Sequence, residues 1–134
     1  MLSDGGSLRV DSSIFTSNVA YGRGGAFYLR ENSFEIISST FTLNEAKLSG
    51  GALRILSASG DIQDCNFVQN NALLQGGAVS YHEVDTASHI LSLTRVSFAR
   101  NKQTGSNLHP NDEGGGGLYI EGKAIANFRE CVFL

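Results

Sequence analysis

The sequence predicts an all-β chain that forms a right-handed parallel β-helix of about five coils, with a basic period of 26 residues. Three observations predict this fold: a phenylalanine with an asparagine three residues later, a word of two glycines and a small residue, and alternating apolar positions between them. Because two different words share one period, we interpret residues 1–134 as a single β-helix segment, part of a longer stack or assembly.

The first word places phenylalanines at regular intervals, from Phe15 to Phe41 to Phe67, each 26 residues apart. Coils of a parallel β-helix lie about 4.8 Å apart, so equivalent residues lie over one another. The asparagine of each word suits a corner, because its amide can bond backbone groups and it tolerates a left-handed conformation. We therefore predict a phenylalanine stack of Phe15, Phe41, Phe67, Phe98 and Phe133, and an asparagine ladder of Asn18, Asn44, Asn70 and Asn101.

The second word is a pair of glycines followed by a small residue. It begins at Gly24, Gly50 and Gly76, and we align a fourth copy as Gly116, Gly117 and Leu118. Paired glycines at a repeating corner indicate positive φ angles or a lack of room for a Cβ atom.

Between the words, apolar or small residues alternate with polar ones, as short strands with one buried face require. The strand after the glycines has the inward pairs Phe27 and Leu29, Leu53 and Ile55, Val79 and Tyr81, and Leu118 and Ile120. A further inward set precedes each phenylalanine by seven, five and two residues, as at Leu8, Val10 and Ser13. This pattern predicts three short strands per coil around a triangular core.

Two loop insertions stretch the later copies, near residues 82–90 and 102–115, by five and nine residues. Insertions that leave the flanking words intact are typical of surface loops on a repeating scaffold. The first recognisable inward position is Leu8, so we expect the first coil to lack the strand that follows the glycines. A solenoid end exposes unpaired strands, so we expect further β-helix coils or a protein partner at the open ends.

Composition excludes several classes of function. The net charge is −3 and no run of Lys or Arg is present, which argues against nucleic acid as a partner. No apolar run approaches the ~18 residues of a membrane span. Cys65 and Cys131 are too few for a zinc set, and we expect no disulfide between them, because they occupy one position two coils apart. We predict no cofactor.

One outward column of residues offers a candidate ligand or partner face. Tyr28, Arg54, Ser80 and Tyr119 occupy equivalent outward positions on the strand that follows the glycines, and the two insertions flank this strand. We call these four residues the Tyr–Arg column. Aromatic and cationic side chains between two loops suit a groove for a glycan or a peptide. Tyr and Arg are also common on ordinary β-surfaces.

Paired carboxylates of one coil, Asp61 and Asp64, are the residue type that acid/base catalysis uses. Stacking, however, brings Asp61 into a column with Arg9 and Glu35, and Asp64 into a column with Arg95 and Glu130. Columns of mixed charge indicate surface ion pairs. The sequence holds no catalytic motif, and we predict that the chain is not an enzyme.

The two insertions are rich in residues that can bind metal. The first contains His82, Glu83, Asp85 and His89, and the second contains His109, Asp112 and Glu113. Solvated loops are often rich in such residues, and no tight spacing such as His-x-x-x-His occurs. We therefore predict no metal site.

The alternation of Phe-x-x-Asn with Gly-Gly-Ala along the whole chain resembles the repeats of chlamydial polymorphic outer membrane proteins and related pectin-lyase-like adhesins. This resemblance implies a non-catalytic, structural or adhesive β-helix at the cell surface or outside the cell. Two alternatives stay open: a carbohydrate-binding or carbohydrate-cleaving module of the pectin-lyase type, and an intracellular scaffold subunit of a large complex.

Overall fold

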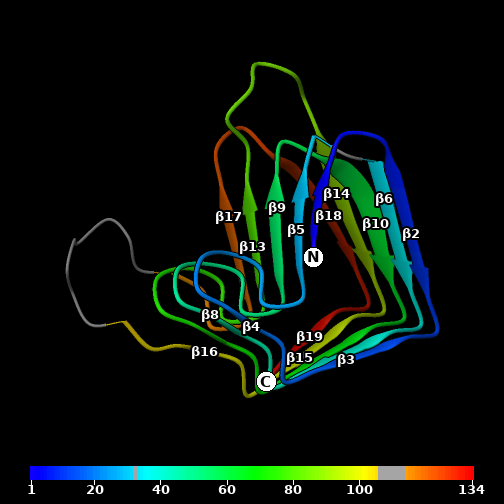
Figure 1. The fold of residues 1–134 in the computed structure, drawn as a ribbon. Helices are drawn as coiled ribbons and strands as arrows, with labels where there is room; N and C mark the ends of the chain where they lie inside the picture. Colours follow the sequence, from blue (N-terminus) through cyan, green and yellow to red (C-terminus); the bar gives the residue numbers. More distant parts are fainter. Residues whose placement is uncertain (32, 106–113) are drawn as a thin grey trace.

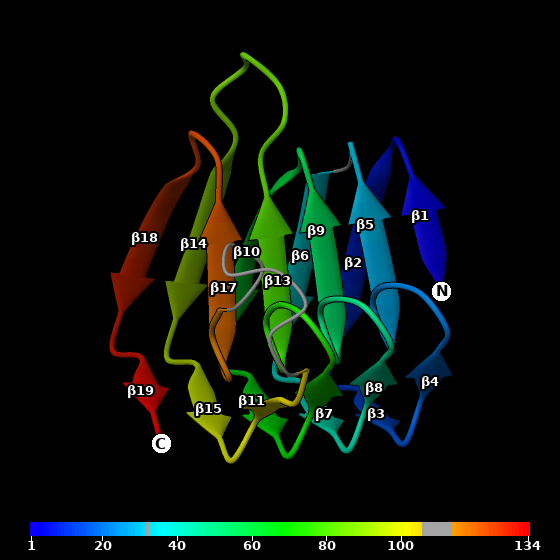
Figure 2. The ribbon, with the colours of Figure 1, turned by 90° about the vertical axis from the view of Figure 1, so that its left-hand side faces the viewer.

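The chain forms a parallel β-helix, as predicted. The computed structural model describes residues 1–31, 33–105 and 114–134, and these residues contain strands, turns and no helix. Seen from the end that carries the N-terminus, the chain turns clockwise as it recedes, so the β-helix is right-handed (Figure 1, Figure 2).

Four parallel sheets surround the interior (Figure 1). Each of the first four coils contributes one strand to each sheet in turn, and the fifth contributes strands to sheets A, B and C. Sheet A contains β1 (Leu2–Asp4), β5 (Phe27–Arg30), β9 (Leu53–Leu56), β13 (Val79–His82) and β17 (Leu118–Glu121). Sheet B contains β2 (Ser7–Asp11), β6 (Ser33–Ile37), β10 (Ser59–Gln63), β14 (Ile90–Thr94) and β18 (Ile125–Arg129). Sheet C contains β3 (Ile14–Thr16), β7 (Thr40–Thr42), β11 (Asn66–Val68), β15 (Ser97–Ala99) and β19 (Val132–Phe133). Sheet D contains β4 (Val19–Ala20), β8 (Glu45–Ala46), β12 (Asn71–Ala72) and β16 (Lys102–Gln103).

The prediction of three strands per coil was wrong, because sheet D was missed. Its strands have two residues each and follow the asparagine corner directly. One inward residue per strand, such as Ala46 or Ala72, is too short a pattern to show alternation.

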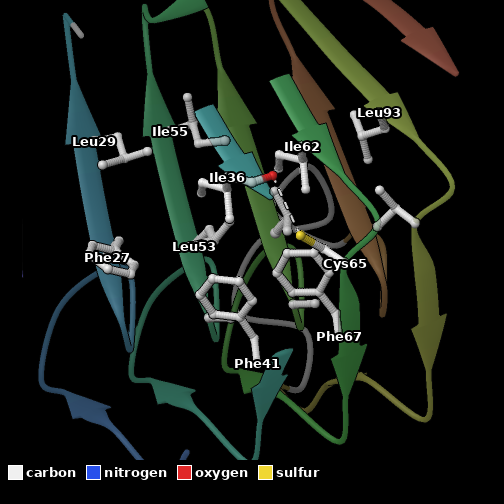
Figure 3. Close-up of a cluster of buried hydrophobic side chains, with 14 of the residues drawn as sticks. Phe27, Leu29, Ile36, Phe41, Leu53, Ile55, Ile62, Cys65, Phe67 and Leu93 are labelled. Atoms are coloured by element: carbon white, nitrogen blue, oxygen red, sulfur yellow. Dashed lines mark hydrogen bonds between the residues drawn. The ribbon is translucent and has the colours of Figure 1, made fainter. Parts of the chain in front are cut away.

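The phenylalanine stack runs through the interior beside sheet C. The register pairs Phe15 with Phe41, Phe41 with Phe67, Phe67 with Phe98, and Phe98 with Phe133. Consecutive ring centroids lie 4.8–5.1 Å apart, and their planes are nearly parallel. Figure 3 shows Phe41 and Phe67 among the buried aliphatic side chains that fill the rest of the core.

The asparagine ladder closes the corner between sheets C and D through buried hydrogen bonds. Asn44 Nδ2 donates to Asn70 Oδ1 of the next coil at 2.9 Å and to the carbonyl of Phe15 in the coil before at 3.0 Å. The same Asn70 Oδ1 also accepts the backbone N–H of Asn44. The left-handed conformation lies one residue earlier than expected, at Ser17, Leu43, Gln69 and Arg100, where φ is 55–57°.

In the glycine word, the first glycine needs a positive φ angle and the second needs the absence of a Cβ atom. Gly50 has φ 66°, and a Cβ at Gly51 would lie 1.9 Å from the carbonyl oxygen of Gly77 in the next coil. The fourth copy was aligned one residue too late. Backbone bonds from Gly76 and Gly77 reach Gly114 and Gly115, so the word begins at Gly115, and Gly117 takes the place of the alanine.

The insertions and the first coil also differ in detail from expectation. The first insertion is the loop 83–89, between β13 and β14, whereas Lys102 and Gln103 at the start of the second belong to β16. Most of the second insertion, residues 106–113, lies outside the described residues. The first coil does have its sheet A strand, because Leu2–Asp4 pairs with β5 without a preceding glycine word.

Candidate functional site

The Tyr–Arg column lies on the outer face of sheet A, as the alternation predicts. The register places Leu2 beside Tyr28, Tyr28 beside Arg54, Arg54 beside Ser80, and Ser80 beside Tyr119. Figure 2 shows this face of the sheet, with the loops that precede β5, β9 and β13 curving in front of its lower end. The structure therefore brings all four predicted residues into one row across β5, β9, β13 and β17.

The two central residues of the column are buried although they point outward. Arg54 is 6% exposed and Ser80 is fully buried, whereas Tyr28 and Tyr119 at the two ends are half-buried. The loops in front of the glycine words lie against this part of the sheet, because their residues line the same cavity as Arg54. Bridges join these loops from coil to coil, from Ser49 to Gln75 and from Gln75 to Gly114. A cavity of about 310 Å³ lies between sheet and loops, lined by Arg54, His82, Glu121, Arg23, Leu48, Ser49, Leu74 and Gln75.

Sequence reasoning missed the loop side of this cavity. Leu48 with Ser49 and Leu74 with Gln75 stand two and one residues before the first glycine of consecutive coils. They share the 26-residue period, which is the signal that could have identified them. They were missed because only the glycines themselves were read as the corner.

Arg54 is a buried cation without a carboxylate partner among the described residues. Its Nη1 donates to Ser80 Oγ at 2.7 Å, and its Nε is buried with no hydrogen-bond partner in that part of the chain. Burial lowers the pKa of the Arg54 guanidinium, and the nearby positive charge of Arg23 lowers it further. Buried charges are normally paired, since desolvation of an unpaired ion is costly.

The nearest acidic residue of the cavity is already engaged. Glu121 Oε2 lies 2.9 Å from Nδ1 of His82, on the outward column next to Arg54. His82 therefore does not join the other metal-binding candidates of the first insertion. Its side chain belongs to the sheet A cavity.

The remaining candidates of the first insertion form a small cluster at the base of loop 83–89. Glu83, Asp85 and His89 each offer one ligand atom within 4.8 Å of the others. Both oxygens of the buried Glu83 already have protein partners: Oε1 accepts from Ser57 Oγ and the Asp85 N–H, and Oε2 lies 2.6 Å from His89 Nδ1. Burial would raise the pKa of Glu83, but these hydrogen bonds lower it below its ordinary value. The arrangement suits a loop anchor. His109, Asp112 and Glu113 lie outside the described residues.

The carboxylates Asp61 and Asp64 lie away from the cavity, on sheet B and at the end of β10. Asp64 forms two hydrogen bonds with Arg95, at 2.6 and 2.8 Å, and this partner lowers the pKa of the Asp64 carboxyl group. A lowered pKa suits an ion pair and opposes a role as general acid. In the column of Asp61, Arg9 bonds Glu35 as expected. In the column of Asp64, Glu130 bonds its sequence neighbour Arg129.

Both cysteines are free thiols. Cys65 is fully buried and Cys131 is partly buried, and Val96 of the intervening coil lies between them in the column. Burial raises the pKa of the Cys65 thiol. No helix within the described residues could cross a lipid bilayer.

Comparison with known proteins finds one family model that matches part of the chain. Residues 12–30 match the model of the Chlamydia polymorphic membrane protein repeat. The matched segment includes Phe15 and Asn18 and continues through the first glycine word into β5, so it contains both words of the predicted repeat. The predicted resemblance to these repeats is therefore confirmed. No curated protein and no solved structure matches the chain.

Proposed function

We propose that this chain is a non-catalytic, adhesive repeat segment of a cell-surface protein, and that it binds its target through the outer face of sheet A. The repeat of a membrane-protein family at residues 12–30 supports a surface repeat segment. The adhesive role is inferred from the shape and composition of the sheet A face.

The observation that carries the proposal is the row of Tyr28, Arg54, Ser80 and Tyr119 beside a cavity. Two half-buried aromatic rings frame a cationic centre, and the loop residues Leu48 and Leu74 add apolar surface. Concave sites lined by apolar and aromatic groups, with a few fixed polar groups, are typical of ligand binding.

Binding of the labelled chain to glycan and peptide arrays tests this function. The double variant Tyr28→Ala with Tyr119→Ala should lose at least about tenfold in affinity for every ligand that the parent chain binds, because the aromatic ends of the row are removed. Thermal melting should show that the fold is retained, since both residues lie outside the core cluster.

The matched control is Ile14→Ala with Val19→Ala, which removes exposed apolar side chains from sheets C and D. This control should bind like the parent. Equal loss in both double variants, unchanged binding of the tyrosine variant, or no ligand on either array would each contradict the proposal.

A further inference from the structure

Arg54 carries a positive charge into a cavity whose acidic lining residue, Glu121, already pairs with His82. Arg54 is only 6% exposed, and it lines the cavity. Its side chain donates a hydrogen bond to the neutral hydroxyl of Ser80. Its Nε has no partner within the described part of the chain. An arginine in this state provides a preorganised receptor for an anion, because its planar fork matches a carboxylate.

Four other arginines of the chain differ from Arg54 in this respect. Arg9, Arg30, Arg95 and Arg129 are more exposed, and each lies within ion-pair distance of an acidic side chain. In the cavity itself, Arg23 adds a second positive charge, while Glu121 is held by His82. The cavity therefore favours a negatively charged group.

We propose that the sheet A cavity binds an acidic sugar residue, whose carboxylate pairs with Arg54 and whose ring lies along the Tyr–Arg column. This inference rests on the proposed function and names the ligand class for the same face. Ser49, Gln75 and His82 supply side-chain groups for hydroxyls, and Leu48 and Leu74 supply apolar contact. A cavity of about 310 Å³ is the size of a small-ligand site.

The mixed lining favours a sugar over an acidic peptide. A peptide added to a β-protein pairs with an exposed strand edge, whereas every inner strand of sheet A is paired on both sides. The available surface is the face of the sheet, and its side chains alternate aromatic, charged and hydroxyl groups. A sugar ring presents both an apolar face and hydroxyls, which fits this sequence of groups.

Titration calorimetry with a glucuronate-containing tetrasaccharide tests the inference, and the same sugar with its carboxyl groups reduced to alcohols is the control ligand. The parent chain should bind the acidic form and lose about 10- to 100-fold in affinity for the reduced form. Arg54→Gln should cause a similar loss, and Arg54→Lys a smaller one, because lysine keeps the charge without the fork. Arg30→Gln should bind like the parent, because Arg30 lies on β5 in the neighbouring outward column, where it pairs with Leu56.

Arg54→Gln should fold, because it removes an unpaired buried charge, and its melting temperature verifies this. Equal affinity for both sugars, or unchanged affinity in Arg54→Gln, overturns the inference, as does the absence of binding by the acidic tetrasaccharide. If a decaglutamate peptide binds in place of the sugar, and its affinity falls in Arg54→Gln, the sugar inference is overturned. The site is then assigned to an acidic protein. In each of these cases, array binding that depends on Tyr28 and Tyr119 leaves the proposed function standing.

Discussion

Each inner asparagine of the ladder bonds three partners at once, and this explains why the residue recurs. Asn70 donates from Nδ2 to Asn101 Oδ1 and to the Phe41 carbonyl, and its Oδ1 accepts from Asn44. Only an amide offers two donors and an acceptor in this small volume. Aspartate in the same column would place like charges about 4.8 Å apart in a buried site, so the uncharged residue is required.

The phenylalanine stack allows a matched test of burial. Phe67→Ala should reduce the free energy of unfolding by about 3–5 kcal/mol, because the fully buried ring leaves a cavity between Phe41 and Phe98. Phe133→Ala removes a ring that is 52% exposed in the last coil and should cost well under half as much. Urea denaturation followed by circular dichroism measures the free energy of unfolding of both variants. Equal losses would show that the position of a ring in the stack has no influence on stability.

At the residue scale, the sequence was sufficient to predict which side chains point inward, and insufficient to predict which outward ones are covered. The period of 26 aligns Phe15 with Phe41 and Tyr28 with Arg54. Burial of Arg54 depends on how the loops before the glycines fold back over sheet A, and these loops show no alternation. The left-handed residues before the asparagines share no residue type either, since Ser17, Leu43, Gln69 and Arg100 differ in chemistry.

At the scale of elements, loop 83–89 is attached to the scaffold by one buried carboxylate. Glu83 connects the loop to Ser57 of the preceding coil and to His89 at the other end of the loop. Residues 84–88 between these attachments are exposed. The five inserted residues therefore begin and end at one anchored point.

This anchor predicts an acid-dependent loss of stability. The folded-state pKa of Glu83 lies below its ordinary value of 4.5, so its contribution is present above that value and is lost as pH falls through the folded pKa. Glu83→Gln should cost roughly 1–3 kcal/mol at pH 6, because hydrogen bonds to a charged group are replaced by weaker ones. The difference between parent and variant should shrink steadily below about pH 4.5.

Urea unfolding at pH 6, 5, 4 and 3 measures this difference. Glu31→Gln provides the control, since Glu31 occupies the equivalent position two coils earlier and is exposed beside Arg30. A Glu83→Gln penalty that is independent of pH would show that the charge of Glu83 has no part in holding the loop.

Sheet D illustrates why the elements were only partly predictable. Strands of four or five residues in sheets A and B show period 2, whereas β4, β8, β12 and β16 have two residues each. Their pairing depends on the asparagine corner that directs the chain into them, as when Glu45 N–H donates to the Asn18 carbonyl. Such a strand is defined by its neighbours and not by its own pattern.

For the whole molecule, the two end coils present edges that the inner coils lack. Strands β17, β18 and β19 pair on one side only, and Phe128, Val132 and Phe133 are each about half exposed there. Unpaired parallel strands beside apolar side chains are a template for association with another chain. We therefore propose that further β-helix coils or a protein partner cover these ends.

When the 134-residue chain is prepared alone, we expect it to self-associate. Sedimentation velocity between 1 and 100 µM should show a weight-average mass that rises with concentration. Phe128→Arg should reduce this association, because it places a charge on the exposed end of the core. Tyr21→Arg alters a 91% exposed side chain in the first coil and should associate like the parent. A monomer throughout the range would contradict the prediction.

The anchored loop also allows the length of the chain between its two attachments to vary. Beyond it, Ile90 pairs with Ile125 and Thr94 with Arg129, so the coil regains its alignment whatever length of chain has left the surface. Because closing a longer loop adds only about 0.6 kcal/mol for each doubling of its length, extra residues cost the scaffold little. Related sequences can therefore differ in length and composition at residues 84–88 while the buried columns stay unchanged. The segment is equally a point at which a foreign peptide can be displayed.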